Sequence, residues 1–248
     1  NEFTLELTVV FSELQLSEHE RSSAYNAVLG DWRSLREATE AVKADRDVVR
    51  AALRGSGLAL EFAHVGLRAD RAIVFQAIKQ NWQALQFASI ALRGDKEVVV
   101  EAIGQSVLAM EYISEELRAD KQFVMERVCE NGLAVKFACP GLKADKEIIC
   151  AAIRSRPHAL QFAEEPLKSD RDIAMQAVHL DGNTLQHVDP ALRLDKELVL
   201  AAIREDWEAL RFVGKSKEIM LTVVSEDWHV LQVIGQPWNA DKDIVLEA

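Results

Sequence analysis

The chain has few cysteines, and they follow no disulfide or metal-binding pattern. Cys129, Cys139 and Cys150 are an odd number, and no two of them form a C-x-x-C pair. This disfavours both a disulfide framework and a zinc site. We therefore interpret the three as small buried apolar residues of a protein in a reducing intracellular compartment.

Long apolar runs and basic blocks are also missing. No run approaches the roughly 18 to 20 apolar residues that span a bilayer, and there is no signal-peptide pattern. Peripheral attachment to a membrane complex stays open. The 29 basic and 40 acidic residues give a net charge of −11. This charge repels a phosphate backbone, so we expect no nucleic-acid partner.

The sequence carries no recognisable catalytic or cofactor motif. Its histidines form no H-x-x-x-H pair, and the cysteines have no adjacent base. The turn Gly55–Gly57 lacks the following Lys of a nucleotide-binding loop. His187 stands where other repeats have Phe62 or Phe87, which indicates a core substitution. We expect no catalytic residue, no cofactor and no metal.

What the chain does contain is a repeat. A segment like Leu117–Lys121 recurs every 25 residues, with an Asp that is followed by Arg or Lys and preceded two places earlier by Arg or Lys. These aspartates are Asp45, Asp70, Asp95, Asp120, Asp145, Asp170 and Asp195. A fixed period of this size is typical of a solenoid.

Each repeat predicts two short helices. We number positions from the Asp as zero; positions 3, 4, 7 and 8 are apolar, as in Ile148, Ile149, Ala152 and Ile153, which is one face of a helix of about nine residues. Helix-breaking residues follow at positions 10 to 12. A second set of apolar residues, at positions 14, 15, 17 and 18, predicts another short helix. Gly or Pro at positions 20 and 21 predicts a turn, pinned by an apolar residue at 22.

The Asp at position zero suits a helix N-cap, because its side chain can accept from unpaired backbone N–H groups. The predicted caps are Asp45, Asp70, Asp95, Asp120, Asp145, Asp170, Asp195, Ser216 and Asp241. The alternative, a ladder of cation sites, is disfavoured because Lys or Arg residues flank each carboxylate. We therefore expect N-capping combined with ion pairing between repeats.

The two ends depart from the pattern. In residues 1–19, Phe3, Leu5, Leu7, Val9 and Phe11 alternate with more polar residues, which predicts a β-strand or hairpin. The repeats then occupy residues 20–248. They start at 20, 45, 70, 95, 120, 145, 170, 195, 216 and 241, so the repeat that begins at Asp195 is four residues shorter than the others. Since residue 248 falls inside a predicted helix, we expect the native chain to continue.

The recurring D-[KR]-E-h-h-x-x-A-h, A-L-x-F-A and L-[RK]-x-D, where h is apolar, resembles the repeat of a domain-of-unknown-function family, number four-one-one-six. Its unit of about fifty residues corresponds to two of the present repeats. Residues 70–119 and 120–169 match well, and the resemblance covers about residues 45 to 200. It implies a helical-repeat fold and no catalytic residues.

Tryptophans form the most distinctive outlier. Trp32, Trp82, Trp207 and Trp228 share position 12, where other repeats have Gly or Pro. Packing along one edge of the array explains them, and the functional alternative is a row of aromatic anchors for a protein partner. Trp238 falls at position 22 instead, so the row is broken.

These patterns predict an all-α protein, an α-solenoid of short helix-turn-helix repeats with a small N-terminal β segment. The expected function is non-enzymatic: a protein-protein interaction or scaffold protein. A narrower version is a peripheral structural subunit of a large organellar complex. The alternative is the recognition arm of an enzyme or ligand-binding protein whose active part lies outside this segment.

Overall fold

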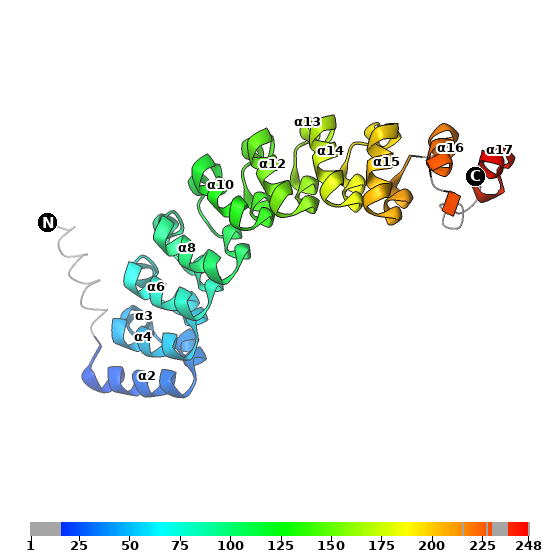
Figure 1. Cartoon of the computed structure of the whole chain (residues 1–248). Helices are drawn as coiled ribbons and strands as arrows, with labels where there is room; N and C mark the ends of the chain where they lie inside the picture. The colour runs from blue at the N-terminus through cyan, green and yellow to red at the C-terminus, as the bar shows by residue number, and fades with distance from the viewer. Residues whose placement is uncertain (1–15, 215, 227, 230–237, 248) are drawn as a thin grey trace. The chain divides into compact units, whose positions relative to one another are not determined.

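The computed structural model describes residues 16–214, 216–226, 228–229 and 238–247. All regular secondary structure in these residues is helical, as the sequence predicted. The chain divides into two compact parts, residues 1–118 and 119–248. In the N-terminal part, the long helices α2, α4, α6 and α8 lie side by side (Figure 1).

Every regular repeat consists of one long helix followed by two shorter ones. The long helices are α2 (Glu18–Gly30), α4 (Arg46–Gly55), α6 (Arg71–Gln80) and α8 (Lys96–Gln105), then α10 (Lys121–Glu130), α12 (Lys146–Ser155), α14 (Arg171–Leu180), α15 (Lys196–Glu205), α16 (Lys217–Glu226) and α17 (Lys242–Glu247). The second helices are of the 3₁₀ type: η1 (Trp32–Glu37), η2 (Gly57–Phe62), η3 (Trp82–Phe87), η4 (Val107–Glu111), η5 (Gly132–Phe137), η6 (Pro157–Phe162), η7 (Gly182–His187) and η9 (Trp207–Phe212).

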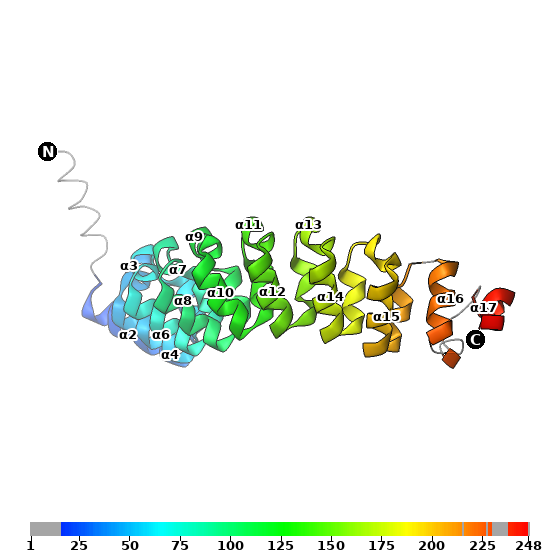
Figure 2. The same cartoon turned by 45° about the horizontal axis from the view of Figure 1, so that its top comes forward.

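A third, very short helix occupies the segment that we predicted to be a turn. Its copies are α3 (Glu40–Ala44), α5 (Val65–Arg68), α7 (Ile90–Arg93), α9 (Glu115–Ala119), α11 (Pro140–Lys143), α13 (Glu165–Lys168) and η8 (Leu192–Leu194). Figure 2 shows α11 and α13 at the same end of the long helices. The turn prediction was wrong because proline fits the first turn of a helix, where its missing N–H is not needed; Pro140 and Pro166 lie there.

The N-terminal β prediction falls mainly on residues 1–15, outside the described residues. Glu18 and His19, which we assigned to that segment, instead lie in the first turn of α2. The reason is a capping box: the Ser17 side chain accepts from the Glu20 backbone N–H, and the Glu20 carboxylate accepts from the Ser17 backbone N–H. The helix therefore begins two residues before the predicted repeat.

The aspartates at position zero cap the long helices. Asp145, for example, accepts from the backbone N–H groups of Glu147 and Ile148 at 2.9 and 3.3 Å. Carboxylate acceptance from such N–H groups is seen at Asp45, Asp70, Asp95, Asp120, Asp145, Asp170, Asp195 and Asp241. Ser216 directly precedes α16, and its carbonyl oxygen accepts from the Met220 N–H.

The residue at position 11 ends one helix and starts the next. Asn131 has an extended backbone, donates its N–H to the Arg127 carbonyl of α10, and accepts from the Leu133 N–H of η5 through its side chain. Ser56, Asn81, Ser106, Asp181 and Asp206 act in the same way. A short polar side chain can satisfy both helix ends, which explains the sharp turn.

The core lies where the long helices and 3₁₀ helices of successive repeats pack together. In α12 the predicted apolar face is fully buried, with Ile148, Ile149, Ala152 and Ile153 at 0% exposure. Ala159 and Leu160 of η6 are equally buried. The helix-period pattern therefore identified the core face correctly.

Two kinds of polar contact join successive repeats within each part. A backbone N–H at position 19 donates to the carbonyl 21 residues earlier, in the preceding repeat: His64 to Lys43, Ser89 to Arg68, Ser114 to Arg93, Glu164 to Lys143, and Asp189 to Lys168. The cation at position 1 pairs with the Asp of the following repeat: Arg21–Asp45, Arg46–Asp70, Arg71–Asp95, Lys121–Asp145, Lys146–Asp170, Arg171–Asp195 and Lys217–Asp241.

Candidate binding surface

A row of half-buried apolar side chains runs across the partly exposed face of the long helices in the C-terminal part. It is formed by the residue at position 5, which lies between the two buried pairs of each helix. We call it the apolar stripe; its members are Met125 (α10), Cys150 (α12), Met175 (α14), Leu200 (α15) and Leu221 (α16). All five are half-buried, and their helices pack in this order. They therefore form one continuous surface across several repeats.

Charged residues border the stripe on both sides. Positions 2, 5 and 9 share one helix face because they are three and four residues apart. Position 2 gives an acidic edge of Glu147, Asp172, Glu197 and Glu218, and position 9 gives a basic edge of Arg154, His179 and Arg204. Met125 is flanked by the uncharged Gln122 and Cys129, so the edges of opposite charge begin at Cys150.

The acidic edge is only partly neutralised. Lys121 pairs with Glu147 at 2.9 Å, Lys196 pairs with Glu218 at 2.7 Å, and Arg171 pairs with Glu197. The N-cap aspartates add a further carboxylate at each helix start. At the beginning of α12, for instance, Asp145 and Glu147 flank one cation, Lys146. Carboxylates therefore exceed cations along this edge.

A surface cavity opens at the α15–α16 end of the stripe. Its volume is about 410 Å³, and its apolar lining includes Leu200, Ile203, Trp207 and Val223. The Trp207 side chain is 55% exposed. Arg204 at the rim pairs with Glu226 of α16 at 2.7 Å. Because Leu200 belongs to both features, the stripe leads directly into the cavity.

The predicted tryptophan row splits into two kinds of environment. Trp32 and Trp82 are half-buried and stack on an aromatic residue 30 positions later, Phe62 and Tyr112, with ring centroids 6.1 Å apart in each pair. Packing between repeats thus accounts for these two. Trp207 and Trp228 are more than half exposed, at 55% and 52%; Trp228 stacks on His229.

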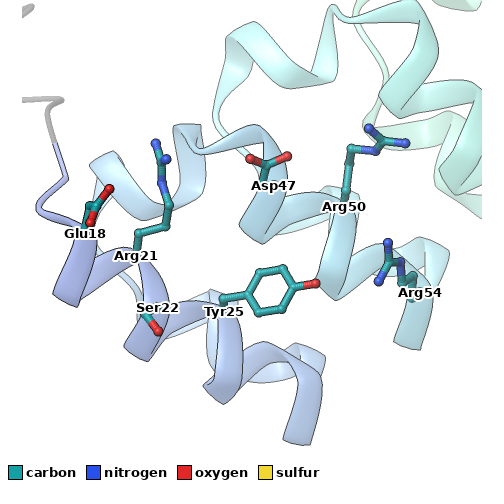
Figure 3. Close-up of a pocket in the computed structure, with 7 residues that line it drawn as sticks. All are labelled: Glu18, Arg21, Ser22, Tyr25, Asp47, Arg50 and Arg54. Atoms are coloured by element: carbon teal, nitrogen blue, oxygen red, sulfur yellow. The ribbon is translucent and has the colours of Figure 1, made fainter.

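The N-terminal part carries no equally apolar row at position 5 in its described residues. There the position holds Tyr25, Arg50, Phe75 and Val100, and Lys79 lies over the Phe75 ring at 4.9 Å. Between α2 and α4 is a surface cavity of about 510 Å³. Figure 3 shows Tyr25 extending from α2 toward α4. Arg50 and Arg54 of α4 also line this cavity. The same helix face is therefore more basic and more aromatic here.

The C-terminal part also contains a cluster of three polar side chains, His158, Asp181 and His187. His158 Nε2 lies 3.1 Å from Asp181 Oδ2, and His158 Nδ1 lies 3.0 Å from His187 Nε2. The pKa of His187 is lowered to about 4, mainly by burial and further by His158, Lys168 and Arg193. We predicted His187 to be a core substitution; it is half-buried and bonded to a neighbouring repeat.

The cysteine prediction needs correction. Cys129 is exposed, while Cys139 and Cys150 are half-buried. The helix period explains this for Cys129 and Cys150, because positions 9 and 5 lie away from the buried positions 3, 4, 7 and 8. Cys139 is the residue before α11. Cys150 instead belongs to the apolar stripe. Gly55–Gly57 joins α4 to η2, as the interpretation of a turn required.

The stripe itself was missed at the level of sequence. The signal was present, because position 5 is apolar from Met125 to Leu221 although its immediate neighbour at position 6 is mostly polar or small. It was overlooked because Met, Cys and Leu adjoin the core positions. Among the described residues, no helix is long and apolar enough to cross a membrane. The described side chains also include no cluster of three or more His, Cys, Asp or Glu suited to a metal.

Comparison with known proteins gives one result. The family model described as "Domain of unknown function (DUF4116)" matches three times in tandem, over residues 70–118, 120–168 and 170–216. The copies correspond to pairs of 25-residue repeats, which confirms the resemblance seen in the sequence. No curated protein and no solved structure matches the chain.

Proposed function

The chain belongs to the DUF4116 family, and we propose that it is a non-enzymatic interaction or scaffold protein that binds another protein across several of its repeats. We further propose that the repeats form an α-solenoid. Regular backbone and ion-pair links between successive repeats support this architecture. In such an array each repeat can contribute one side chain to an extended surface.

The apolar stripe is the observation that carries the proposal. If position 5 only faced solvent, its residues would be expected to be polar, like those at position 2. Instead, Met125, Met175 and Leu200 present apolar side chains along successive helices. Methionine is flexible and polarizable, which suits an adaptable contact surface. The exposed ring of Trp207, in the cavity at the end of the stripe, adds a residue type enriched in binding hot spots.

A matched pair of variants tests the proposal. Met175→Glu places a charge in the stripe, whereas Leu180→Glu places the same charge on the same helix, outside the stripe; Leu180 is 50% exposed. The tagged protein would be purified from its native source, and its partners identified and quantified by mass spectrometry. We expect a stoichiometric partner with wild type and Leu180→Glu that is lost with Met175→Glu.

Two results would overturn the proposal: recovery of the wild-type protein alone as a monodisperse monomer, or retention of the same partner by Met175→Glu. The identity of the partners also tests the narrower version, a peripheral subunit of a large organellar complex. That version requires the subunits of one such complex to be recovered together in fixed ratio.

A further inference from the structure

The width of the apolar stripe limits what can bind there. Positions 2 and 9 lie about 5–6 Å from position 5 on the helix surface, so acidic and basic residues border the row from Cys150 to Leu200. A partner α-helix is about 10 Å wide and buries an apolar face of 100° or more. Such a helix would press its flanking apolar residues against Glu147, Asp172 or Arg154. A thinner, extended segment fits the row better.

The spacing of the stripe selects the conformation of that segment. Packed helices lie about 8–10 Å apart, and each contributes one stripe residue. A polyproline II segment has three residues per turn and rises about 3.1 Å per residue, so it repeats every ~9.3 Å. A β-strand shows the same face every ~6.7 Å, which does not match. An apolar residue at every third position of a polyproline II segment would therefore meet each helix in turn.

The acidic and basic edges of the stripe determine which side chains are favoured at the other two residues of each triplet of the bound segment. In a threefold helix the other two side chains of each triplet point sideways, about 120° away from the apolar one. One would face Glu147, Asp172 and Glu197. Lys121 and Arg171 already pair with the two glutamates, but carboxylates outnumber cations along this edge, so a further cation is favoured. The other would face Arg154 and Arg204, where an anion is favoured. Opposite charges on the two flanks also fix the direction in which the segment lies.

We propose that the apolar stripe binds an extended segment of a partner protein in which an apolar residue recurs at every third position, with basic residues on one flank and acidic residues on the other. Met125, Cys150, Met175 and Leu200 recur every 25 residues of the sequence, and at one helix per triplet they accommodate about ten residues of such a segment. The cavity of about 410 Å³ beside Leu200 receives a bulky apolar side chain at its end. This inference rests on the proposed function and specifies its partner.

Labelled peptides provide the test. The probe is a fluorescein-labelled 15-mer of five Leu-Lys-Glu triplets, with Pro in place of the second and fourth Lys to prevent α-helix formation. The control peptide has the same composition with the leucines at irregular spacing. Fluorescence anisotropy with the full chain should show the control binding about tenfold more weakly or worse, a difference of about 1.4 kcal/mol.

The same variants locate the site. Met175→Glu should weaken binding of the period-three probe about tenfold or more, and Leu180→Glu should leave it within about twofold. Met125→Glu, on α10, is the second stripe variant in case Met175→Glu loses its helical circular dichroism. Equal binding of the probe and the irregular peptide, or full binding by both stripe variants, overturns the inference.

The two proposals fail in different ways. If Met175→Glu abolishes the cellular complex while the probe has no advantage over the irregular peptide, the extended-segment inference is wrong and the interaction function stands. If no stripe-dependent complex is recovered and the probe does not bind, both are overturned.

Discussion

Gly57 shows how close the backbones of neighbouring repeats come. A Cβ atom at this position would lie 2.2 Å from the carbonyl oxygen of Ala77 in the next repeat. Gly132 and Gly182, also at position 12, face Ala152 and Ala202 at 2.5 and 2.2 Å. The sequence indicated these glycines as helix breakers, but their main role is to permit a close approach of two backbones.

We predict that Gly57→Ala destabilises the N-terminal part by about 1–3 kcal/mol, the usual cost of overpacking. Gly104→Ala is the control, because nothing lies within 4 Å of its added Cβ in α8. Alanine is the better helix former, so the control should gain about 0.5–1 kcal/mol. Urea unfolding of the two variants measures the difference, and a Gly57→Ala protein as stable as wild type would contradict the prediction.

The lowered pKa of His187 predicts that the C-terminal part loses stability in mild acid. Its folded-state pKa of about 4 lies below the unfolded value of 6.5, so the unfolded chain binds more protons between these values and stability falls as pH drops through this range. His187→Phe introduces the residue found at position 17 of other repeats. We predict a smaller loss of thermal midpoint between pH 7 and pH 5 in this variant.

The control for this effect is His179→Gln, which removes an exposed histidine of the same repeat. It should keep the wild-type pH dependence. An identical fall in midpoint for wild type and His187→Phe would show that the His187 ring does not control the acid response.

Side-chain pairs of this kind could not be predicted from the repeat. His158 and His187 are 29 residues apart, and Trp32 and Phe62 are 30 apart. A period of 25 identifies equivalent positions; it does not show which non-equivalent positions of two packed repeats meet. That depends on the angle and distance between helices, which the sequence pattern leaves open. Shared position 12 therefore suggested one role for four tryptophans that lie in different environments.

Among the helices, the N-cap carboxylates have a second function. Asp170 accepts from the backbone of its own helix and also from Lys146 Nζ of the preceding repeat, at 2.8 Å. The hydrogen bond from Lys146 is the main reason that the pKa of Asp170 is lowered. One carboxylate thus begins a helix and joins it to its neighbour.

Substitutions at Asp170 separate these contributions. Asp170→Ala loses the cap and the ion pair, and we predict a loss of about 0.5–2 kcal/mol. Asp170→Asn keeps an acceptor for the backbone N–H groups and should lose less. Denaturant midpoints give the comparison, and an equal loss in both variants would mean that capping by the side-chain oxygen contributes nothing.

The sequence predicted the long helices well because caps and buried residues act within a few positions of one another. It predicted the segment around Pro140 and Gly141 poorly. Proline and glycine favour turns, but the fold places Pro140 where a helix accepts it. The apolar stripe was missed for a related reason, since an apolar residue beside the core pattern looks like part of the core.

Across the molecule, the links described between repeats join only adjacent ones, and stability should therefore follow nearest neighbours. Ile149 of α12 is fully buried, and α12 packs on α10 and α14. We predict that Ile149→Ala, which costs about 2–5 kcal/mol, speeds hydrogen exchange in α10, α12 and α14. Exchange in α16, which packs on α15 and α17, should stay unchanged. Uniform acceleration in all these helices would indicate a single cooperative unit.

The pairing of a position-1 cation with the next position-zero aspartate makes the joints between repeats chemically interchangeable. Lys121–Asp145, Lys146–Asp170 and Arg171–Asp195 join the same two positions of the repeat, through Nζ of Lys or Nε of Arg. Duplication or loss of a whole 25-residue segment would leave a matching joint behind, whereas a shift of a few residues would not. The length of the array, and with it the number of contacts offered to a partner, can therefore change in evolution one module at a time.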